Sequence, residues 1–189
     1  MNLLHIDSSI TGEASASRAI TAAVVARLTA EHPHVAVTYR DLAAAPISHL
    51  SLADLAGADT QAIVGEFLAA DVVVIGAGFY NFTIGSQLKA WIDRIVIPGA
   101  TFRYGENGIE GLAGDKRVIV ALARGGVYAP GTPMAAFEHA ETYLRAVFGM
   151  LGVTALDVIV AEGLKMSDEH RAAALDAALA HAGALRIAA

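Results

Sequence analysis

The chain has 189 residues, of which 55% are hydrophobic and 6% aromatic, and it carries a formal net charge of −6 with no cysteine. This length suits one domain with a single sizeable core, and the apolar content excludes a disordered chain. Without cysteine there is no disulfide framework, thiolate metal site or cysteine nucleophile, and a negative chain without a basic cluster is not expected to bind nucleic acid.

We also expect no membrane span and no signal peptide. The longest stretch without a charge, residues 72–88, contains four polar side chains and three glycines, so it is not an apolar span of about 20 residues. Residues 1–9 lack a basic n-region and reach a charge at Asp7. The expected location is the cytoplasm.

Apolar patterns predict the elements in chain order. Residues 3–6 form a short apolar run that predicts a buried strand, and the following helix is predicted to begin at an N-cap, Ser17, and to end before Pro33. Ser167 is the expected cap of the last helix. The remaining predictions are strands at 35–39, 72–75, 118–122 and 158–161, helices at about 60–70, 84–95, 133–151 and 168–185, and a glycine-rich loop at 99–114.

Strands that alternate with helices indicate parallel pairing with right-handed crossovers. Five strands in a chain of this length predict an α/β fold of one domain, residues 1–189, with a flavodoxin-like doubly wound sheet in the order 2-1-3-4-5 and helices on both faces. In that sheet the order of successive strands reverses between strands 1 and 3. Ligands of such folds bind at this reversal point, beyond the carboxyl ends of the strands. The loops that matter are therefore 7–17, 76–85 and 123–132.

The first loop offers hydroxyls at Ser9, Ser15 and Ser17 immediately before a helix, with Arg18 adding positive charge. A helix N-terminus favours an anion, so this loop predicts a phosphate site; the alternative is an ordinary polar loop with a cap. The sequence has no Walker loop and no dinucleotide fingerprint.

The second loop places three aromatic residues, Phe79, Tyr80 and Phe82, within four positions of an aromatic-poor chain. They predict a face for a planar ligand, or else rings that fill the core end of the strand. In the third loop, Gly125 and Gly126 allow a close approach of backbone amides, or simply form a turn. Together the loops suggest a phosphorylated planar cofactor such as flavin mononucleotide (FMN).

Five motifs support a more specific interpretation. They are Ser-Ser-Ile and Ser-x-Ser within residues 8–17, F-Y-N-F at 79–82 with Q-L-K at 87–89, T-F-R-Y-G-E-N-G-I-E-G-L at 101–112, R-G-G at 124–126 and A-E-G at 161–163. In this order and spacing the chain resembles, over nearly its whole length, the FMN-dependent NADH azoreductases, also described as quinone reductases.

The resemblance implies an FMN-dependent oxidoreductase that uses NADH or NADPH as a transient donor to reduce quinones and azo compounds in a ping-pong cycle. It also implies a homodimer, and it assigns no catalytic acid or base and no metal site. The FMN-binding residues that it implies are Ser9, Ser15, Ala16 and Ser17 at the phosphate, Phe79, Tyr80, Asn81 and Phe82 along the ring, and Ala123, Arg124, Gly125 and Gly126 at its polar edge. The implied substrate pocket contains Tyr104, Tyr128 and Met150.

The sequence departs from the family pattern at four positions. Gly78 and Phe79 stand where the family has proline and methionine, and Ala16 and Ala123 stand where polar residues are common. Backbone contacts to a cofactor survive these changes, so we expect them to affect the range of substrates more than cofactor binding.

Two rival functions remain. A passive flavodoxin-like FMN electron carrier would bind the same cofactor with little NADH oxidation, although a strongly acidic surface is typical of that class and −6 is modest. A hydrolase that uses Ser8 or Ser9 would need a G-x-S-x-G motif, which the sequence lacks, and a histidine partner.

The histidines show no H-E-x-x-H pattern, which argues against a metal site. The physiological acceptor and the choice between NADH and NADPH stay open.

Overall fold

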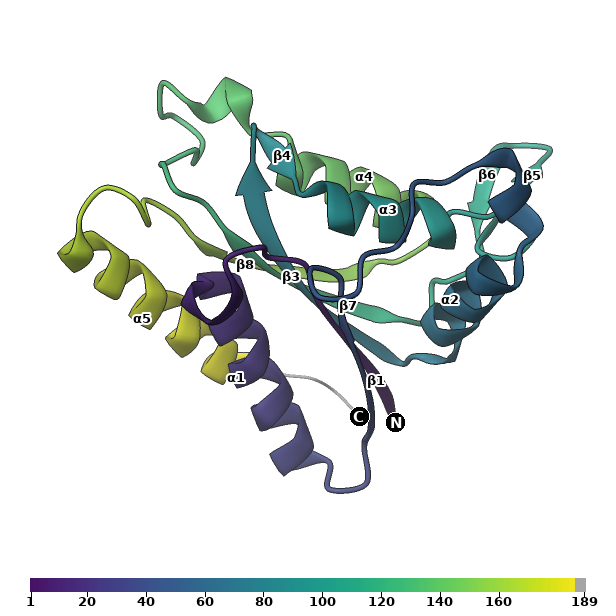
Figure 1. Cartoon of the computed structure of the whole chain (residues 1–189), viewed down its shortest axis with the longest axis horizontal. Coiled ribbons are helices and arrows are strands. Elements are labelled where there is room, and N and C mark those ends of the chain that lie inside the picture. The colour runs from purple at the N-terminus through teal and green to yellow at the C-terminus, as the bar shows by residue number, and fades with distance from the viewer. Residues whose placement is uncertain (186–189) are drawn as a thin grey trace.

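Five parallel strands form the centre of the molecule in the order β2-β1-β3-β7-β8 (Figure 1). The computed structural model describes residues 1–185. The strands are β1 (Asn2–Asp7), β2 (Ala36–Asp41), β3 (Val72–Tyr80), β7 (Arg117–Ala123) and β8 (Ala155–Ala161). This order is the predicted 2-1-3-4-5, so the flavodoxin-like fold is confirmed.

Helices cover both faces of the sheet (Figure 1). One face carries α1 (Ala16–Glu31) and α5 (Asp168–Ala184), and the other carries α2 (Ala58–Ala69), α3 (Ser86–Ile95) and α4 (Ala140–Met150). Successive residues of β3 alternate between the two cores: Val72 and Val74 pack on the first face, and Val73 and Ile75 on the second. Burial on both sides explains why this strand is a continuous apolar run.

The starts of four helices differ from their predictions: α2 begins at Ala58 rather than 60, and α3 at Ser86 rather than 84. The differences at α1 and α4 have local causes. Ser15, not Ser17, is the N-cap of α1, because the short 3₁₀ turn η1 (Gly12–Ala14) leads the chain in and the Ser15 side chain accepts from the N–H of Arg18. The helix predicted at 133–151 contains the separate 3₁₀ turn η3 (Ala135–Phe137), and α4 begins only at Ala140. The Glu138 carboxylate accepts from the first N–H groups of α4 and fixes this start. Ser167 caps α5 as predicted.

The segment predicted as a glycine-rich loop contains a two-stranded hairpin, β5 (Phe102–Gly105) and β6 (Gly108–Gly111). Its strands are short, exposed and rich in glycine, which hid them in the sequence. Close packing requires glycine at position 111, because a Cβ there would lie 2.1 Å from the Gly152 nitrogen. The hairpin is therefore pressed against the end of α4.

The long connection between β2 and α2 includes the 3₁₀ turn η2 (Leu52–Ala56) and is held by Arg94 of α3. This arginine is 2% exposed and donates to the Thr60 hydroxyl at 2.7 Å and to the Ser48 hydroxyl at 2.9 Å. Within residues 1–185, no helix is long and apolar enough to cross a membrane.

Candidate functional site

Loops at the carboxyl ends of β1, β3 and β7 enclose two adjoining clefts of about 490 and 550 Å³. The clefts share Phe79, Gly125 and Lys165, so they form one continuous surface across the predicted reversal point of the sheet. The first is also lined by Ser9, Thr11, Ala14, Ser15, Ala16, Gly78, Tyr80, Ala123, Leu164 and Arg171, and the second by Asn81, Phe82, Gly126, Tyr128 and Met166.

The first cleft is suited to an anion. The Ser9 hydroxyl lies 2.9 Å from that of Thr11, and both line the cleft beside the start of α1. The N–H groups of Ala16 and Ser17 stand in the first turn of α1, where no intrahelical acceptor exists, and the helix dipole adds positive potential. Every described residue that lines this cleft is neutral or cationic. The geometry thus fits a phosphate group.

Ser17 lies behind this surface rather than on it. Its side chain is fully buried, and its hydroxyl lies 3.0 Å from that of Ser15. Ser17 therefore belongs to neither cleft through its side chain; it orients Ser15, which does line the first cleft.

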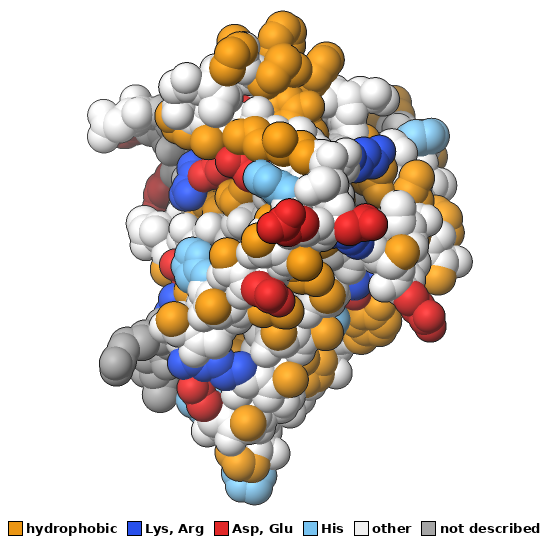
Figure 2. Space-filling view, turned by 90° about the vertical axis from the view of Figure 1, so that its left-hand side faces the viewer, with side chains coloured by type: hydrophobic (Ala, Val, Ile, Leu, Met, Phe, Trp, Pro, Cys, Tyr) orange, Lys and Arg blue, Asp and Glu red, His pale blue; other side chains and the backbone are white. Residues whose placement is uncertain are grey.

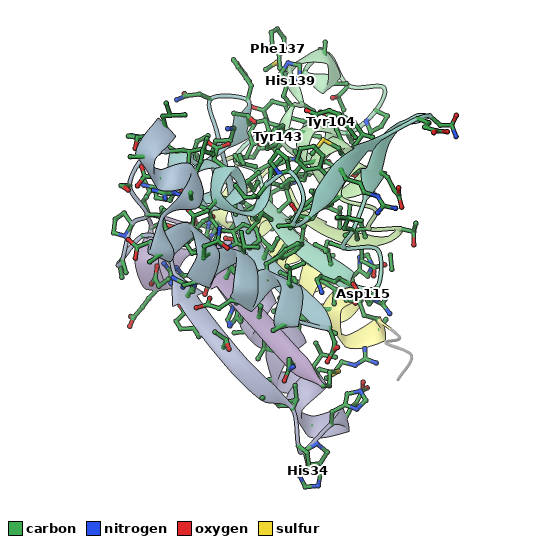
Figure 3. All side chains as sticks on the ribbon, turned by 90° about the vertical axis from the view of Figure 1, so that its right-hand side faces the viewer. His34, Tyr104, Asp115, Phe137, His139 and Tyr143 are labelled. Atoms are coloured by element: carbon green, nitrogen blue, oxygen red, sulfur yellow. The ribbon has the colours of Figure 1, made fainter. Side chains whose placement is uncertain are left out.

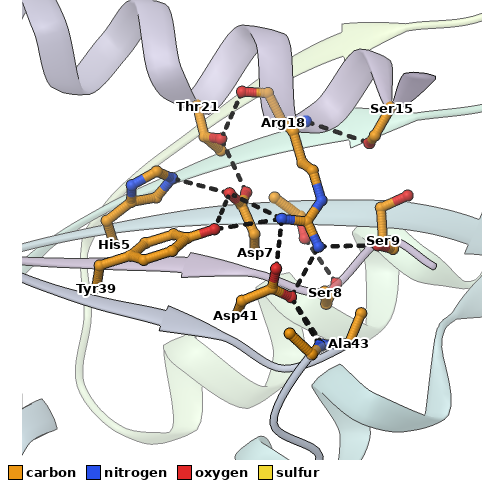
Figure 4. A network of polar contacts seen from close by, with 12 residues as sticks. His5, Asp7, Ser8, Ser9, Ser15, Arg18, Thr21, Tyr39, Asp41 and Ala43 are labelled. Atoms are coloured by element: carbon orange, nitrogen blue, oxygen red, sulfur yellow. Dashed lines mark hydrogen bonds and ion pairs between the residues drawn. The ribbon is translucent and has the colours of Figure 1, made fainter. Parts of the chain in front are cut away.

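Arg18 does not point at the cleft as expected. Its guanidinium donates to both carboxylate oxygens of Asp41 at 2.7 and 2.8 Å and to the Ser9 carbonyl at 3.0 Å (Figure 4). The Arg18 hydrogen bonds lower the pKa of Asp41 to about 2. Arg18 thus ties the first loop, residues 7–17 and hereafter the serine loop, to the end of β2, and its charge is already paired.

A second carboxylate, that of the buried Asp7, lies close to the same arginine (Figure 4). It accepts from the hydroxyls of Thr21 at 2.9 Å and Tyr39 at 3.1 Å, and the His5 imidazole lies 3.4 Å away. Burial alone would raise its pKa, but these contacts and the Arg18 charge hold the pKa of Asp7 below its usual value. The base of the phosphate site is therefore a fixed polar network.

The second cleft is bordered by a strained turn. Strand β4 (Thr83–Ile84) pairs antiparallel with the end of β3, and the two residues between them, Asn81 and Phe82, have φ angles of 46° and 73°. Two consecutive positive φ angles give a type I′ hairpin turn, which Asn adopts readily and Phe adopts only at a cost in strain. Such strain in a non-glycine residue is typical of functional sites.

Aromatic rings line the wall shared by the clefts. The Phe79 and Tyr128 ring centroids lie 4.5 Å apart, and Phe79 both lines the two clefts and packs against the core. At the neighbouring position, a Cβ on Gly78 would lie 2.7 Å from the Tyr80 ring. Glycine at 78 therefore lets Tyr80 lie flat against the backbone of β3, with its hydroxyl 3.4 Å from that of Ser9.

The third loop presents backbone donors. The Gly125 and Gly126 carbonyls accept from the N–H groups of Lys165 and Gly163, each at 2.9 Å. The N–H groups of the two glycines have no acceptor within residues 1–185. They are available to a ligand that lies in the second cleft.

Arg124 occupies a different environment from its neighbours. It is 4% exposed and faces three carboxylates, Glu138 at 3.2 Å, Glu141 at 3.1 Å and Glu162 at 3.5 Å. Its side chain lines neither cleft. Arg124 instead fixes the third loop to the start of α4 and the end of β8.

The three predicted substrate-pocket residues are separated. Tyr128 lines the second cleft, whereas Tyr104 on β5, labelled in Figure 3, is 76% exposed and lines neither cleft. Met150 ends α4, packs against the core and also lines neither cleft. Exposed apolar side chains also gather over η3 and the tip of the β3–β4 hairpin, at the top of Figure 2. They include Phe82 and Phe137, whose ring centroids lie 5.1 Å apart.

Sequence reasoning missed the segment that follows β8. It contributes Leu164, Lys165, Met166 and Arg171 to the clefts. The signal was present in the topology, because β8 is parallel to β7 and its carboxyl end reaches the same edge.

Comparison with known proteins agrees with this geometry. A family model described as a flavodoxin-like fold matches residues 1–185. The chain is 56% identical to an FMN-dependent NADH:quinone oxidoreductase of Methylorubrum populi, over all of both chains, and 53% identical to one of Xanthomonas campestris pv. campestris, over 99% of this chain and all of the other. It superimposes on the crystal structure of an azoreductase from Bacillus anthracis with a TM-score of 0.86 at 28% identity, covering 98% of this chain and all of that one.

Proposed function

The chain belongs to the flavodoxin-like family of FMN-dependent NADH:quinone oxidoreductases and azoreductases, and from this premise we propose that FMN lies across its two clefts. The protein is an FMN-dependent oxidoreductase that takes electrons from NADH and passes them to quinone-type acceptors, with azo compounds as a further class.

One observation carries the placement of the cofactor. A cleft of hydroxyls, helix N–H groups and cations continues directly into a cleft of aromatic rings and glycine amides. A phosphorylated planar molecule matches that change of character from one end to the other. The cysteine-free sequence requires that any redox chemistry belongs to a bound cofactor.

At the phosphate end, the Ser9 and Ser15 hydroxyls and the N–H groups of Ala16 and Ser17 would hold the anion. These groups are preorganised: Arg18 fixes the Ser9 carbonyl and Ser17 orients the Ser15 hydroxyl. Their order before binding lowers the entropy cost of capturing the ligand.

At the ring end, FMN supplies the two-electron chemistry when it is bound. Phe79, Phe82 and Tyr128 would contact the ring system and exclude water from it. The free N–H groups of Gly125 and Gly126 would donate to its polar edge and stabilise negative charge there. Asn81 offers a side-chain amide at the same cleft.

We also propose that the protein works as a homodimer. Tyr104 and Ile109 face each other across the β5–β6 hairpin and are 76% and 52% exposed. Large apolar side chains exposed in this way are typical of a contact surface. A second copy on the hairpin would bring Tyr104 toward a substrate pocket that one chain leaves open.

The function is tested by reconstitution. The purified chain incubated with FMN and then desalted should retain a bound-flavin absorption spectrum, and NADH should be consumed when a quinone or an azo dye is added. Failure to bind FMN would refute the proposal. Bound FMN without NADH oxidation would indicate the passive electron carrier, and ester hydrolysis by a colourless protein would indicate the hydrolase.

A further inference from the structure

Two cations of the first cleft come from a part of the chain that carries no phosphate motif. Arg171 lies in the first part of α5, and Lys165 lies in the loop between β8 and α5. The other residues that line the cleft are uncharged, in a chain whose formal net charge is −6. A local excess of positive charge in a net acidic protein indicates selection for an anion.

Arg171 is joined directly to the serine loop. Its Nη2 donates to the carbonyl of Ala14 at 2.8 Å, across 157 positions of sequence, and Ala14 immediately precedes the cap residue Ser15. This bond uses one of the five N–H donors of the guanidinium. Arg171 also lines the first cleft, together with Ser15 and Ala16 at the start of α1.

Lys165 is rooted in the third loop. Its backbone N–H donates to the Gly125 carbonyl, and its aliphatic carbons cover Gly125 so closely that a Cβ there would lie 3.1 Å from Lys165 Cδ. Its side chain borders both clefts where they meet. Lys165 thus adds positive charge where the third loop separates the two clefts.

Arg18, the arginine that follows the serine loop in sequence, is not free to bind the phosphate. Arg18 is bound to both oxygens of Asp41 and lies 3.7 Å from Asp7, so its charge is already compensated. The start of α1 therefore provides hydroxyl and N–H donors for a phosphate dianion, but its arginine does not provide an uncompensated positive charge.

We propose that Arg171, with Lys165 as a second cation, binds the phosphate group of FMN from the α5 side and so selects FMN over unphosphorylated riboflavin. The inference rests on the proposed function. It makes the first part of α5 a second wall of the phosphate site, beside the start of α1.

The test compares FMN with riboflavin on the full-length chain stripped of flavin, with fluorescence quenching as the readout. Arg171→Ala should weaken FMN binding about tenfold or more, the scale of a lost charge-assisted hydrogen bond, and leave riboflavin binding within about twofold. Lys165→Ala should weaken FMN binding less, with the same selectivity. Arg27→Ala removes an equal charge from the surface of α1, where Arg27 pairs with Glu31 and lines neither cleft, and should change neither affinity.

Two further measurements separate ligand binding from support of the loop. Arg171→Lys keeps the charge and should recover part of the FMN affinity, and inorganic phosphate should compete with FMN less well in Arg171→Ala than in the wild type. Equal weakening of FMN and riboflavin would overturn the inference, because Arg171 would then act only through Ala14. Unchanged FMN affinity would overturn it too, whereas a wild type that binds no FMN would refute the proposed function instead.

Discussion

Asp41 shows how one residue outside both clefts controls the shape of the site. Its carboxylate binds the fork of Arg18 and also accepts from the N–H groups of Ala43 and Ala44, so the end of β2 and the serine loop share a single anchor. The pair is partly shielded from solvent, with side-chain exposures of 17% for Arg18 and 24% for Asp41. A bidentate pair in that setting contributes more than an ordinary surface ion pair.

The pKa of Asp41 gives a prediction for acid stability. Its pKa is about 2 in the folded protein, mainly because Arg18 donates to it, against an ordinary value of 3.8. A depressed folded-state pKa stabilises the protein above pH 4, and this contribution is lost as the pH falls from about 4 to 2. We expect Asp41→Asn to lower the free energy of unfolding at pH 7 by on the order of 2 kcal/mol.

Urea unfolding at a series of pH values measures this effect. The difference between the wild type and Asp41→Asn should shrink as the pH falls from 4 to 2. The exposed Asp176, changed to Asn, serves as the control and should show no such dependence. A difference that stays constant over this range would show that Asp41 does not act through its charge.

Single residues also mark where sequence reasoning reaches its limit. Most of the residues predicted to bind the cofactor line the two clefts, because β1, β3 and β7 deliver their loops to one edge. Ser17 and Arg124 lie behind the surface, because the direction of a side chain depends on partners far away in sequence. Arg124 is fixed by Glu138, Glu141 and Glu162, none of which a local motif could pair with it.

At the scale of elements, the β3–β4 hairpin holds strain at the edge of the second cleft. Its tip is stabilised from outside: the N–H of His139 donates to the Phe82 carbonyl at 2.9 Å, and Phe137 packs on the Phe82 ring. These contacts allow phenylalanine to stay at a φ of 73°. We infer that the ring is kept there for the ligand.

Paired substitutions measure the strain. Phe82→Gly and Phe82→Ala both remove the ring, but only alanine keeps a Cβ at a positive φ. We therefore expect the glycine variant to have a free energy of unfolding about 1 kcal/mol higher than the alanine variant in urea unfolding. Both should bind FMN more weakly than the wild type. An alanine variant as stable as the glycine variant would show that the turn is unstrained.

Element boundaries were predicted unevenly for physical reasons. Buried parallel strands such as β3 and β7 are continuous apolar runs that any reading of the sequence detects. The β5–β6 hairpin is exposed, so no apolar alternation marks it, and of its glycines Gly108 turns the chain at a positive φ whereas Gly111 permits close packing. The start of α4 depends on a cap from Glu138, which shortened the helix predicted from Pro133.

At the scale of the whole molecule, the strand order decides which loops meet. The order 2-1-3-4-5 follows from alternating strands and helices, and it correctly located the clefts. The same order also delivers the loop after β8 to this edge, since β8 pairs with β7 from Arg117↔Ala155 to Ala123↔Ala161. That consequence of the topology is what brings Arg171 and Lys165 into the site.

The proposed dimer gives the prediction at this scale. The hairpin exposes Tyr104 and Ile109 on a two-stranded sheet that protrudes from the domain, and an isolated chain gains nothing from apolar side chains there. We expect the wild type to sediment at about twice the mass of one chain. Ile109→Glu places a charge in the contact and should yield monomers that still bind FMN, because residue 109 lines neither cleft. Val37→Glu, which puts the same charge on exposed β2, should remain dimeric, and a monomeric wild type would contradict the proposal.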